Sequence, residues 1–407
     1  MQIIKKYSHE STNSNFSMSI VWIIGGSNND SKGKKGINQI LSSMLSRGCE
    51  GFNNFEFSEY IYSHGAELNQ EIYEDGILIS LKSLNEHFHK LLPLIDLMIL
   101  RPTLSEDQFQ LVKKSSINSI KKERENLFNI VYEKWRKLIY KNHPYAFNCI
   151  GYEEDISKIE YKDILLEYKE FKSRDKYLIS NNIKYDLNNQ IIDNKFYKGE
   201  LNNIAHNSNQ GYRFVDTYQK SNQTILMLGN QTCSRFDNDY ISLKVLESYL
   251  SYGMSSVLFK FFREKNGITY DVGIYNSPRR GNSPFLVYLS VSNKNALLAF
   301  KLLKQLWTEI LSSQITQDGM KLAKEKLKSS FLLSNQSLEE ILQRKIQLIS
   351  YYQNPKFDEE YLEKIEKVSA PEILQITNKY FSKPFLSVLG QEETCKQIKE
   401  NWISGFL

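Results

Sequence analysis

The sequence predicts an α+β fold made of two homologous domains of about 200 residues each. The first observation is an internal repeat, because the spacing of apolar and acidic residues in 156–164 returns in 365–373. The second is that the predicted strands come in neighbouring pairs, with helices clustered after them. A doubly wound parallel sheet would instead require strands and helices to alternate regularly. Each domain is therefore expected to hold an antiparallel-type sheet flanked by helices.

The elements of the first copy are predicted from the periodicity of its apolar residues. Residues 16–25 alternate between two faces, as a strand does, and the apolar residues of 36–47 recur at helical spacing. Gly48 ends that helix, and Pro102 stops a later apolar helix. The predicted elements are a strand at 16–25, helices at 36–47 and 55–63, strands at 66–73 and 76–84, helices at 85–100, 105–139 and 154–171, and a strand at 176–180.

The second copy repeats this order after a polar segment that is rich in asparagine. Its predicted elements are a strand at 224–229, a helix at 240–250, a second helix that ends before Asn266-Gly267, strands continuing through residue 291, a helix at 297–311, and a strand at 385–389. The predicted organisation is an N-terminal domain at 1–182, a linker at 183–221 and a C-terminal domain at 222–407.

The composition is that of a globular protein and excludes several functional classes. Of 407 residues, 41% are hydrophobic and 24% charged, and no run approaches the roughly 18 apolar residues of a membrane span. The net charge of +5 is small and no Lys/Arg block stands out, which argues against nucleic-acid binding. The four cysteines form no C-x-x-C pair, and the N-terminus lacks the apolar region of a signal peptide. We therefore expect a cytoplasmic protein with reduced thiols.

Residues 252–273, YGMSSVLFKFFREKNGITYDVG, contain the strongest candidate for a ligand-binding site. The first part has an apolar face at helical spacing, Asn266-Gly267 supplies a left-handed stop, and a strand follows. Arg263 is thus expected at the end of a helix and Tyr270 just inside a strand. Both side chains donate hydrogen bonds to carbonyl oxygens, which suits an extended peptide ligand. The alternative is structural: Arg263 complements the helix dipole and Tyr270 packs in a sheet.

The same segment resembles the second-half signature of the pitrilysin/insulinase (inverzincin) family, in its processing-peptidase branch. The matching residues are Gly253, Ser255, Ser256, Leu258, Phe259, Arg263, Glu264, Lys265, Gly267, Tyr270 and Val272. The resemblance covers nearly the whole chain and is weakest through the linker. It implies a duplicated α+β half-shell architecture, in agreement with the internal repeat. It also implies that Arg263 and Tyr270 bind substrate main chain beside the scissile bond.

In this family the first copy carries a zinc-binding helix with the motif G-(L/I)-x-H-x-x-E-H-M, and here the ligands are lost. The resemblance maps the two histidines to Gln39 and Ser43 and the glutamate between them to Ser42. The third ligand maps to Ser119, and a further acidic position to Val112. Amide and hydroxyl groups are poor zinc ligands, and none of these residues can act as a carboxylate base. We therefore expect no metal, cofactor or catalytic residue in this chain, unless a ligand set lies elsewhere.

Two functional classes follow from the resemblance. In the first, the chain is the non-catalytic partner in a heterodimeric zinc peptidase. A homologous H-x-x-E-H subunit would hold the zinc, while this chain would close the peptide chamber and contribute Arg263 and Tyr270. Homodimers are possible when the chain is alone. In the second class, it is a structural core-type subunit of the same fold with no role in proteolysis. Retention of Arg263 and Tyr270 favours the first class. An autonomous hydrolase with another nucleophile has no triad-like support.

Overall fold

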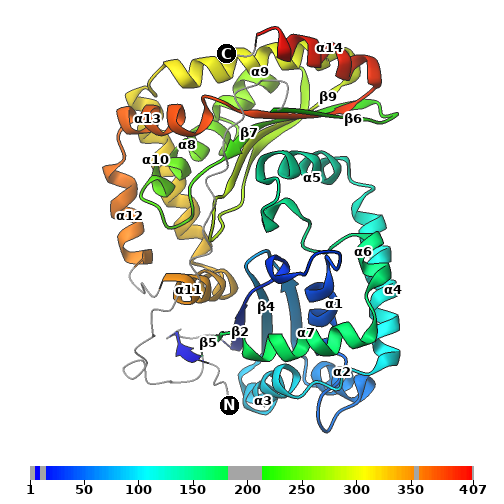
Figure 1. The fold of residues 1–407 in the computed structure, drawn as a ribbon. Helices are drawn as coiled ribbons and strands as arrows, with labels where there is room; N and C mark the ends of the chain where they lie inside the picture. Colours follow the sequence, from blue (N-terminus) through cyan, green and yellow to red (C-terminus); the bar gives the residue numbers. More distant parts are fainter. Residues whose placement is uncertain (1–4, 10–14, 182–212, 353–356, 406–407) are drawn as a thin grey trace. The chain divides into compact units, whose positions relative to one another are not determined.

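The computed structural model describes residues 5–9, 15–181, 213–352 and 357–405. The chain divides into two compact units, each assembled from three segments. The first unit consists of Met1–Glu125, Phe147–Phe196 and Ser334–Pro355, and the second of Asn126–Ala146, Tyr197–Leu333 and Lys356–Leu407. Each unit contains one five-stranded sheet with helices beside it (Figure 1). The predicted fold class, α+β with two homologous domains, is confirmed.

The first unit follows the predicted order of elements, with one strand and one helix added and one predicted helix divided. The single helix predicted at 154–171 is wrong, because Ile159 and Glu160 have extended backbone and separate two helices. Its strands are β1 (Lys5–Ser8), β2 (Phe16–Ile24), β3 (Glu67–Ile72), β4 (Gly76–Leu84) and β5 (Lys176–Ser180); its helices are α1 (Ile37–Leu45), α2 (Asn54–Ser63), α3 (Asn85–Leu100), α4 (Glu106–Glu123), α6 (Glu153–Lys158), α7 (Tyr161–Ser173) and α11 (Leu338–Tyr352). The apolar residues of α1 that share one face by their spacing are all buried, as predicted: Ile37, Ile40, Leu41, Met44 and Leu45.

The second unit repeats the arrangement with its own strands and helices. Its strands are β6 (Phe214–Tyr218), β7 (Gln223–Gln231), β8 (Thr269–Asn276), β9 (Pro284–Ser292) and β10 (Phe385–Gly390); its helices are α5 (Leu127–Tyr140), α8 (Asp239–Ser251), α9 (Ala296–Ser312), α10 (Gln317–Ser334), α12 (Phe357–Lys367), α13 (Ala370–Phe381) and α14 (Glu392–Ile403), together with a π-helical segment at Phe259–Lys265. Within the described part of the chain, no helix has both the length and the apolar character needed to cross a bilayer.

The two sheets have the same topology, which supports the duplication inferred from the sequence. The strand order is β1-β5-β2-β4-β3 in the first and β6-β10-β7-β9-β8 in the second. The outermost pairs β1–β5 and β10–β6 are parallel, whereas the remaining neighbours pair antiparallel. Each sheet is therefore mixed, because it gains one parallel edge strand that the sequence patterns did not identify.

Part of the predicted linker is one of these edge strands. Phe214–Tyr218, within the predicted linker 183–221, forms β6 and pairs with β10. Residues 182–212 lie outside the described residues. The five residues of β6 have no clear alternation of buried and exposed side chains, so the sequence alone does not indicate a strand there. The segment is a strand because it pairs with β10.

The helix predicted at 105–139 is wrong, because the structure contains two helices there. The helix α4 ends at Glu123, and α5 begins at Leu127. The side chain of Asn126 accepts a hydrogen bond of 2.9 Å from the amide of Phe128, and so caps the second helix. The break redirects the chain, since α4 belongs to the first unit and α5 to the second.

The compact units differ from the predicted sequential domains, 1–182 and 222–407, in the assignment of two helices, α5 and α11. In the second unit α5 packs on β10, where Trp135 Nε1 donates to the carbonyl of Phe385 at 3.1 Å and Ser387 Oγ to that of Val131 at 3.1 Å. It lies on the opposite face of the second sheet from α9 (Figure 1). Each unit therefore takes one helix from the half of the sequence that supplies the other sheet.

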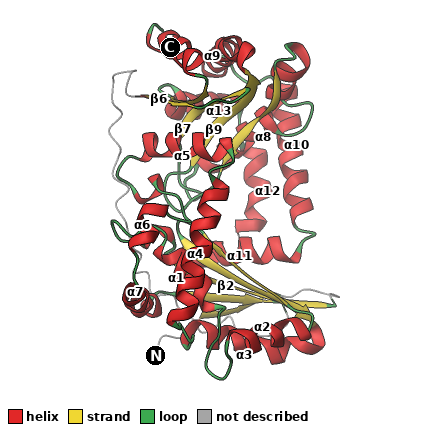
Figure 2. Ribbon diagram, turned by 90° about the vertical axis from the view of Figure 1, so that its right-hand side faces the viewer, coloured by secondary structure: helices red, strands yellow, loops and turns green. Residues whose placement is uncertain are grey.

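In the first unit α11 has the corresponding role on the sheet of β2 and β5. Leu342 and Ile346 are fully buried against apolar residues of this face: Met18, Ile20, Trp22, Leu78, Tyr177 and Ile179. Figure 2 shows α11 and α3 on opposite faces of this sheet. Without α11 the residues of this face would be exposed to water, and their burial is the main favourable term in folding.

Replacing Leu342 with alanine is expected to lower the free energy of unfolding by about 2–5 kcal/mol, because it leaves a cavity beneath α11. Urea unfolding measures the loss. The matched control is Leu166→Ala on α7, where the side chain is 57% exposed and the expected loss is below about 0.5 kcal/mol. Equal losses for the two variants would contradict the assignment of α11 to this core.

Candidate functional site

The helix that corresponds to the family's zinc helix is α1, and a buried carboxylate fixes its start. Asp30 accepts hydrogen bonds from the amides of Gly36 at 2.7 Å and Asn38 at 3.1 Å, and from the Asn38 side chain at 2.8 Å. Burial raises the pKa of Asp30 to about 6, although these hydrogen bonds act to lower it. The carboxylate thus satisfies amides that the first turn leaves without partners.

Glycine is required at the first position of this turn. Gly36 has a φ of 99°, in the left-handed region, and a Cβ there would lie 2.9 Å from the carbonyl oxygen of Ile150. The Arg174 guanidinium adds a hydrogen bond of 2.8 Å to the side chain of Asn38. The position of α1 against α7 and the sheet is therefore set by polar contacts at its start and apolar contacts along its length.

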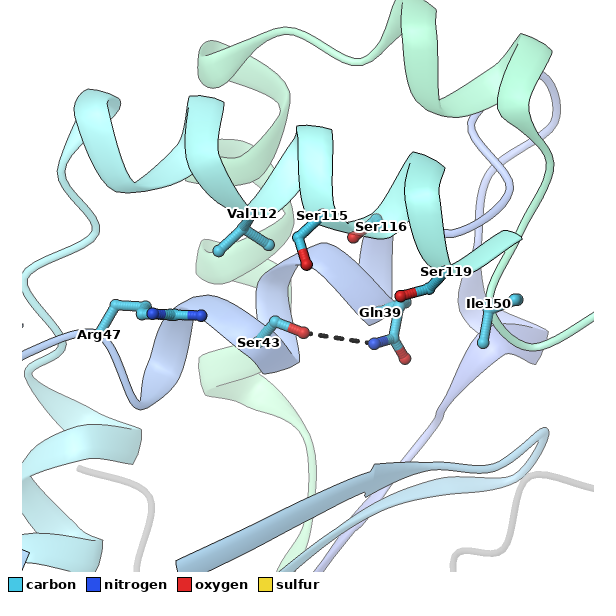
Figure 3. A pocket seen from close by; sticks show the side chains of 8 residues that line it. All are labelled: Gln39, Ser43, Arg47, Val112, Ser115, Ser116, Ser119 and Ile150. Carbon is cyan, nitrogen blue, oxygen red and sulfur yellow. Dashed lines mark hydrogen bonds between the residues drawn. The ribbon is translucent and has the colours of Figure 1, made fainter. Parts of the chain in front are cut away.

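Three of the four degenerate zinc-motif positions meet in one pocket between α1 and α4. The pocket, called the serine pocket below, has a volume of about 90 Å³. It is lined by Gln39, Ser43, Arg47, Val112, Ser115, Ser116, Ser119 and Ile150 (Figure 3). The amide of Gln39 donates to Ser43 Oγ at 3.3 Å. Ser42 is 3% exposed and does not line the pocket, because it lies one residue away from Ser43 around the helix.

The donor atoms of the serine pocket do not fit a zinc ion. Zinc in proteins is held by thiolates, imidazoles and carboxylates, whereas this pocket offers hydroxyl oxygens, one amide and one guanidinium. In the described ranges, no three or more His, Cys, Asp or Glu residues gather where they could hold a metal. The pocket also contains no carboxylate to deprotonate a water molecule, so it lacks the chemistry of a zinc peptidase.

Three polar lining residues were missed by the sequence analysis. Gln39 and Ser43 lie four residues apart on one side of α1, and Arg47 lies two residues beyond the end of this helix at Leu45. Ser115 and Ser116 precede Ser119 by four and three residues on α4, and so face the same way. The helical spacing could have identified them, but only after the two helices were known to face each other.

The second candidate site lies where the π-helical segment meets β8. Arg263 is exposed near the end of this segment, and its guanidinium lies 5.1 Å from the centroid of the Phe259 ring. Asn266 Nδ2 donates to the carbonyl of Phe261 at 2.8 Å, and Gly267 has a φ of 58°. The predicted stop at Asn266-Gly267 is confirmed, and so is the position of Arg263 at a helix end. The wider π turn was not predicted.

Tyr270 lies at an irregularity of β8. Thr269 pairs with Val291 and Asp271 with Ser290, so that the ladder shifts at Tyr270 and forms a bulge. The hydroxyl oxygen of Thr269 lies 2.7 Å from the carbonyl oxygen of Asp271 and 2.8 Å from that of Ser290, so that its single proton can be donated to either of them across the bulge. The Tyr270 side chain is 68% exposed and not packed in the sheet. The packing of Tyr270 within the sheet, which the structural alternative expected, is thus not observed, and its binding role stays a prediction.

Comparison with known proteins places the two copies in related families. The model for Insulinase (Peptidase family M16) matches residues 6–151, and that for Peptidase M16 inactive domain matches residues 185–327. An uncharacterized zinc protease of Rickettsia bellii is 24% identical over 393 residues, covering 94% of this chain and 92% of that protein. The non-peptidase homolog YmxG of Helicobacter pylori is 19% identical over 361 residues, covering 86% and 82%.

The fold matches a solved structure over nearly its whole length. A crystal structure of a peptidase M16 inactive domain from Pseudomonas fluorescens superposes with a TM-score of 0.81 at 20% identity. The match covers 95% of this chain and 96% of the other. The duplicated architecture is therefore shared with that structure across both copies of the repeat.

Proposed function

The chain belongs to the insulinase (peptidase M16) family, and from this premise we propose that it is the zinc-less subunit of a heterodimeric zinc metalloendopeptidase. The other subunit carries the H-x-x-E-H helix with zinc and the catalytic base. This chain closes the peptide chamber and contributes Arg263 and Tyr270 to the binding of an extended peptide. The observation that carries the proposal is a contrast between the two sites. The zinc positions have lost every ligand, whereas Arg263 and Tyr270 are retained and exposed.

The local backbone supports a binding role for this pair. A π turn and a β-bulge are both less regular than the elements around them, and both recur at functional sites. Arg263 lies on the π turn, and Tyr270 lies at the β-bulge. A guanidinium and a phenol held at the surface can donate hydrogen bonds to the carbonyl oxygens of a peptide, and neither is a nucleophile.

The zinc of the proposed complex belongs to the other subunit. Bound there, it would supply Lewis-acid chemistry for peptide hydrolysis. The residues of this chain hold the peptide in register, since a misplacement on the order of 1 Å can reduce the rate about 100-fold. An alternative reading, a structural subunit of the same fold, does not require an exposed arginine and tyrosine at these positions.

Co-expression with an H-x-x-E-H relative is expected to give a complex with about one zinc per heterodimer, all of it on the relative. Elemental analysis of each chain and of the complex measures this, and peptide turnover is expected only when both chains are present. The control replaces the motif glutamate of the relative with glutamine, which keeps the assembly but removes turnover. Stoichiometric zinc on this chain alone, or turnover by it alone, would overturn the proposal.

A further inference from the structure

We propose that the serine pocket binds a carboxylate group, supplied by a peptide C-terminus or by a small carboxylic acid. The inference concerns the residues that replace the zinc ligands and goes beyond the proposed function. It stands on this pocket alone, and it holds whether or not the chain takes part in proteolysis. The observation behind it is that hydroxyl, amide and guanidinium donors surround one pocket that contains no acidic residue.

The donors converge from two helices. Figure 3 shows Ser43 on α1 and Ser115 on α4 facing each other, with Arg47 towards one end of the pocket and Ser119 towards the other. The Gln39 amide adjoins Ser43, to which it donates. Hydroxyl groups turn to suit their partner, so each can donate to an oxygen placed between the helices. Val112 and Ile150 supply apolar walls.

The charge of the lining selects a monoanion. Arg47 is the one ionised residue among those that line the pocket, and its fork of N–H donors matches the two oxygens of a carboxylate. A phosphate group would bring a charge of about −1.5 to −2 and leave part of it without a partner. The volume of about 90 Å³ is enough to admit a small group such as a carboxylate.

The Arg47 guanidinium is available for such a ligand. In the ranges that the structure describes, it forms no ion pair or side-chain hydrogen bond. By contrast, Arg101 of the same unit pairs with Glu50, with Nη1 and Oε2 at 2.7 Å. Arg101 is thus neutralised by a neighbouring carboxylate on the surface. Arg47 has no such partner among the described residues and instead lines a pocket with serine hydroxyl groups.

The test uses isothermal titration of the full chain with N-acetylglycine, and with N-acetylglycinamide as the neutral control of the same shape. We expect saturable binding of the acid at constant ionic strength and none of the amide. The variant Arg47→Gln should bind the acid at least tenfold more weakly, and Ser119→Ala severalfold more weakly. Arg124→Gln replaces an exposed arginine that follows α4 outside the pocket, and it should bind as the unaltered chain does.

Two further ligands identify the source of the carboxylate. Acetate that binds as well as acetylated tri-alanine supports a free small acid, whereas tighter binding of the peptide supports a peptide C-terminus. Phosphate binding without carboxylate binding overturns the proposal. It is also overturned if no acid binds, or if Arg47→Gln binds N-acetylglycine as the unaltered chain does. Because Arg47 is exposed, its variant should keep the unfolding midpoint of the chain, which is checked in the same preparations.

Discussion

Replacing Glu247 with alanine is expected to destabilise the protein by about 3–5 kcal/mol, because the change leaves a buried ammonium group without its partner. Lys244 Nζ lies 2.5 Å from Glu247 Oε2, and the two side chains are only 14% and 11% exposed. Asn276 Nδ2 donates to the same carboxylate oxygen at 2.7 Å. Burial by itself lowers the pKa of Lys244, but the neighbouring Glu247 outweighs it and the net pKa is raised.

Urea unfolding of Glu247→Ala and of a control pair tests this expectation. The control is Glu360→Ala, which breaks the exposed pair of Glu360 and Lys364 in the same unit and should cost about 0.3–0.5 kcal/mol. Replacing Lys244 and Glu247 together with methionine and leucine should recover much of the loss, because no unpaired charge stays buried. A loss for Glu247→Ala no larger than for Glu360→Ala would show that water reaches Lys244.

In the reconstituted heterodimer, Arg263→Ala is expected to reduce peptide turnover about ten- to a hundredfold. A charge-assisted hydrogen bond to bound substrate contributes roughly 1.5–3 kcal/mol. Tyr270→Phe removes a neutral donor and should reduce turnover about two- to tenfold. Assembly should be unchanged, because both side chains are exposed and outside the apolar core.

The matched control is Lys265→Ala, which removes an exposed cation from the same π-helical segment without touching the proposed donor. Turnover measured at equal amounts of assembled complex separates a binding role from a structural one. If Arg263→Ala cleaves as fast as Lys265→Ala, the shared-site proposal fails and the structural-subunit interpretation takes its place. Zinc content, measured in the same samples, should be the same for all variants.

Much of the serine pocket could be predicted from the sequence, because helical spacing places residues on the faces of helices. Gln39 and Ser43 share a face of α1 by their spacing, and the structure brings Ser119 to the same pocket. Arg47 was missed, because one arginine after a helix has no signal of its own. Its significance appears only when α4 supplies hydroxyl groups opposite to it.

The sequence by itself determined the features that depend on neighbouring residues. These are the duplication, the apolar faces of the helices, the stop at Asn266-Gly267 and the identity of the residues at the zinc-motif positions. Each follows from local periodicity or from the chemistry of single side chains. Periodicity states which face of an element is apolar, however, and not what covers it.

Only the tertiary structure decided what covers each face. It assigned α5 to the second sheet and α11 to the first, added β1 and β6 as parallel edge strands, and placed Tyr270 on a bulge. These features arise from contacts between residues far apart in the sequence, where burial of a sheet face outweighs chain order. A helix thus packs wherever its apolar face removes the most surface from water, and this requirement sets the composition of the two units.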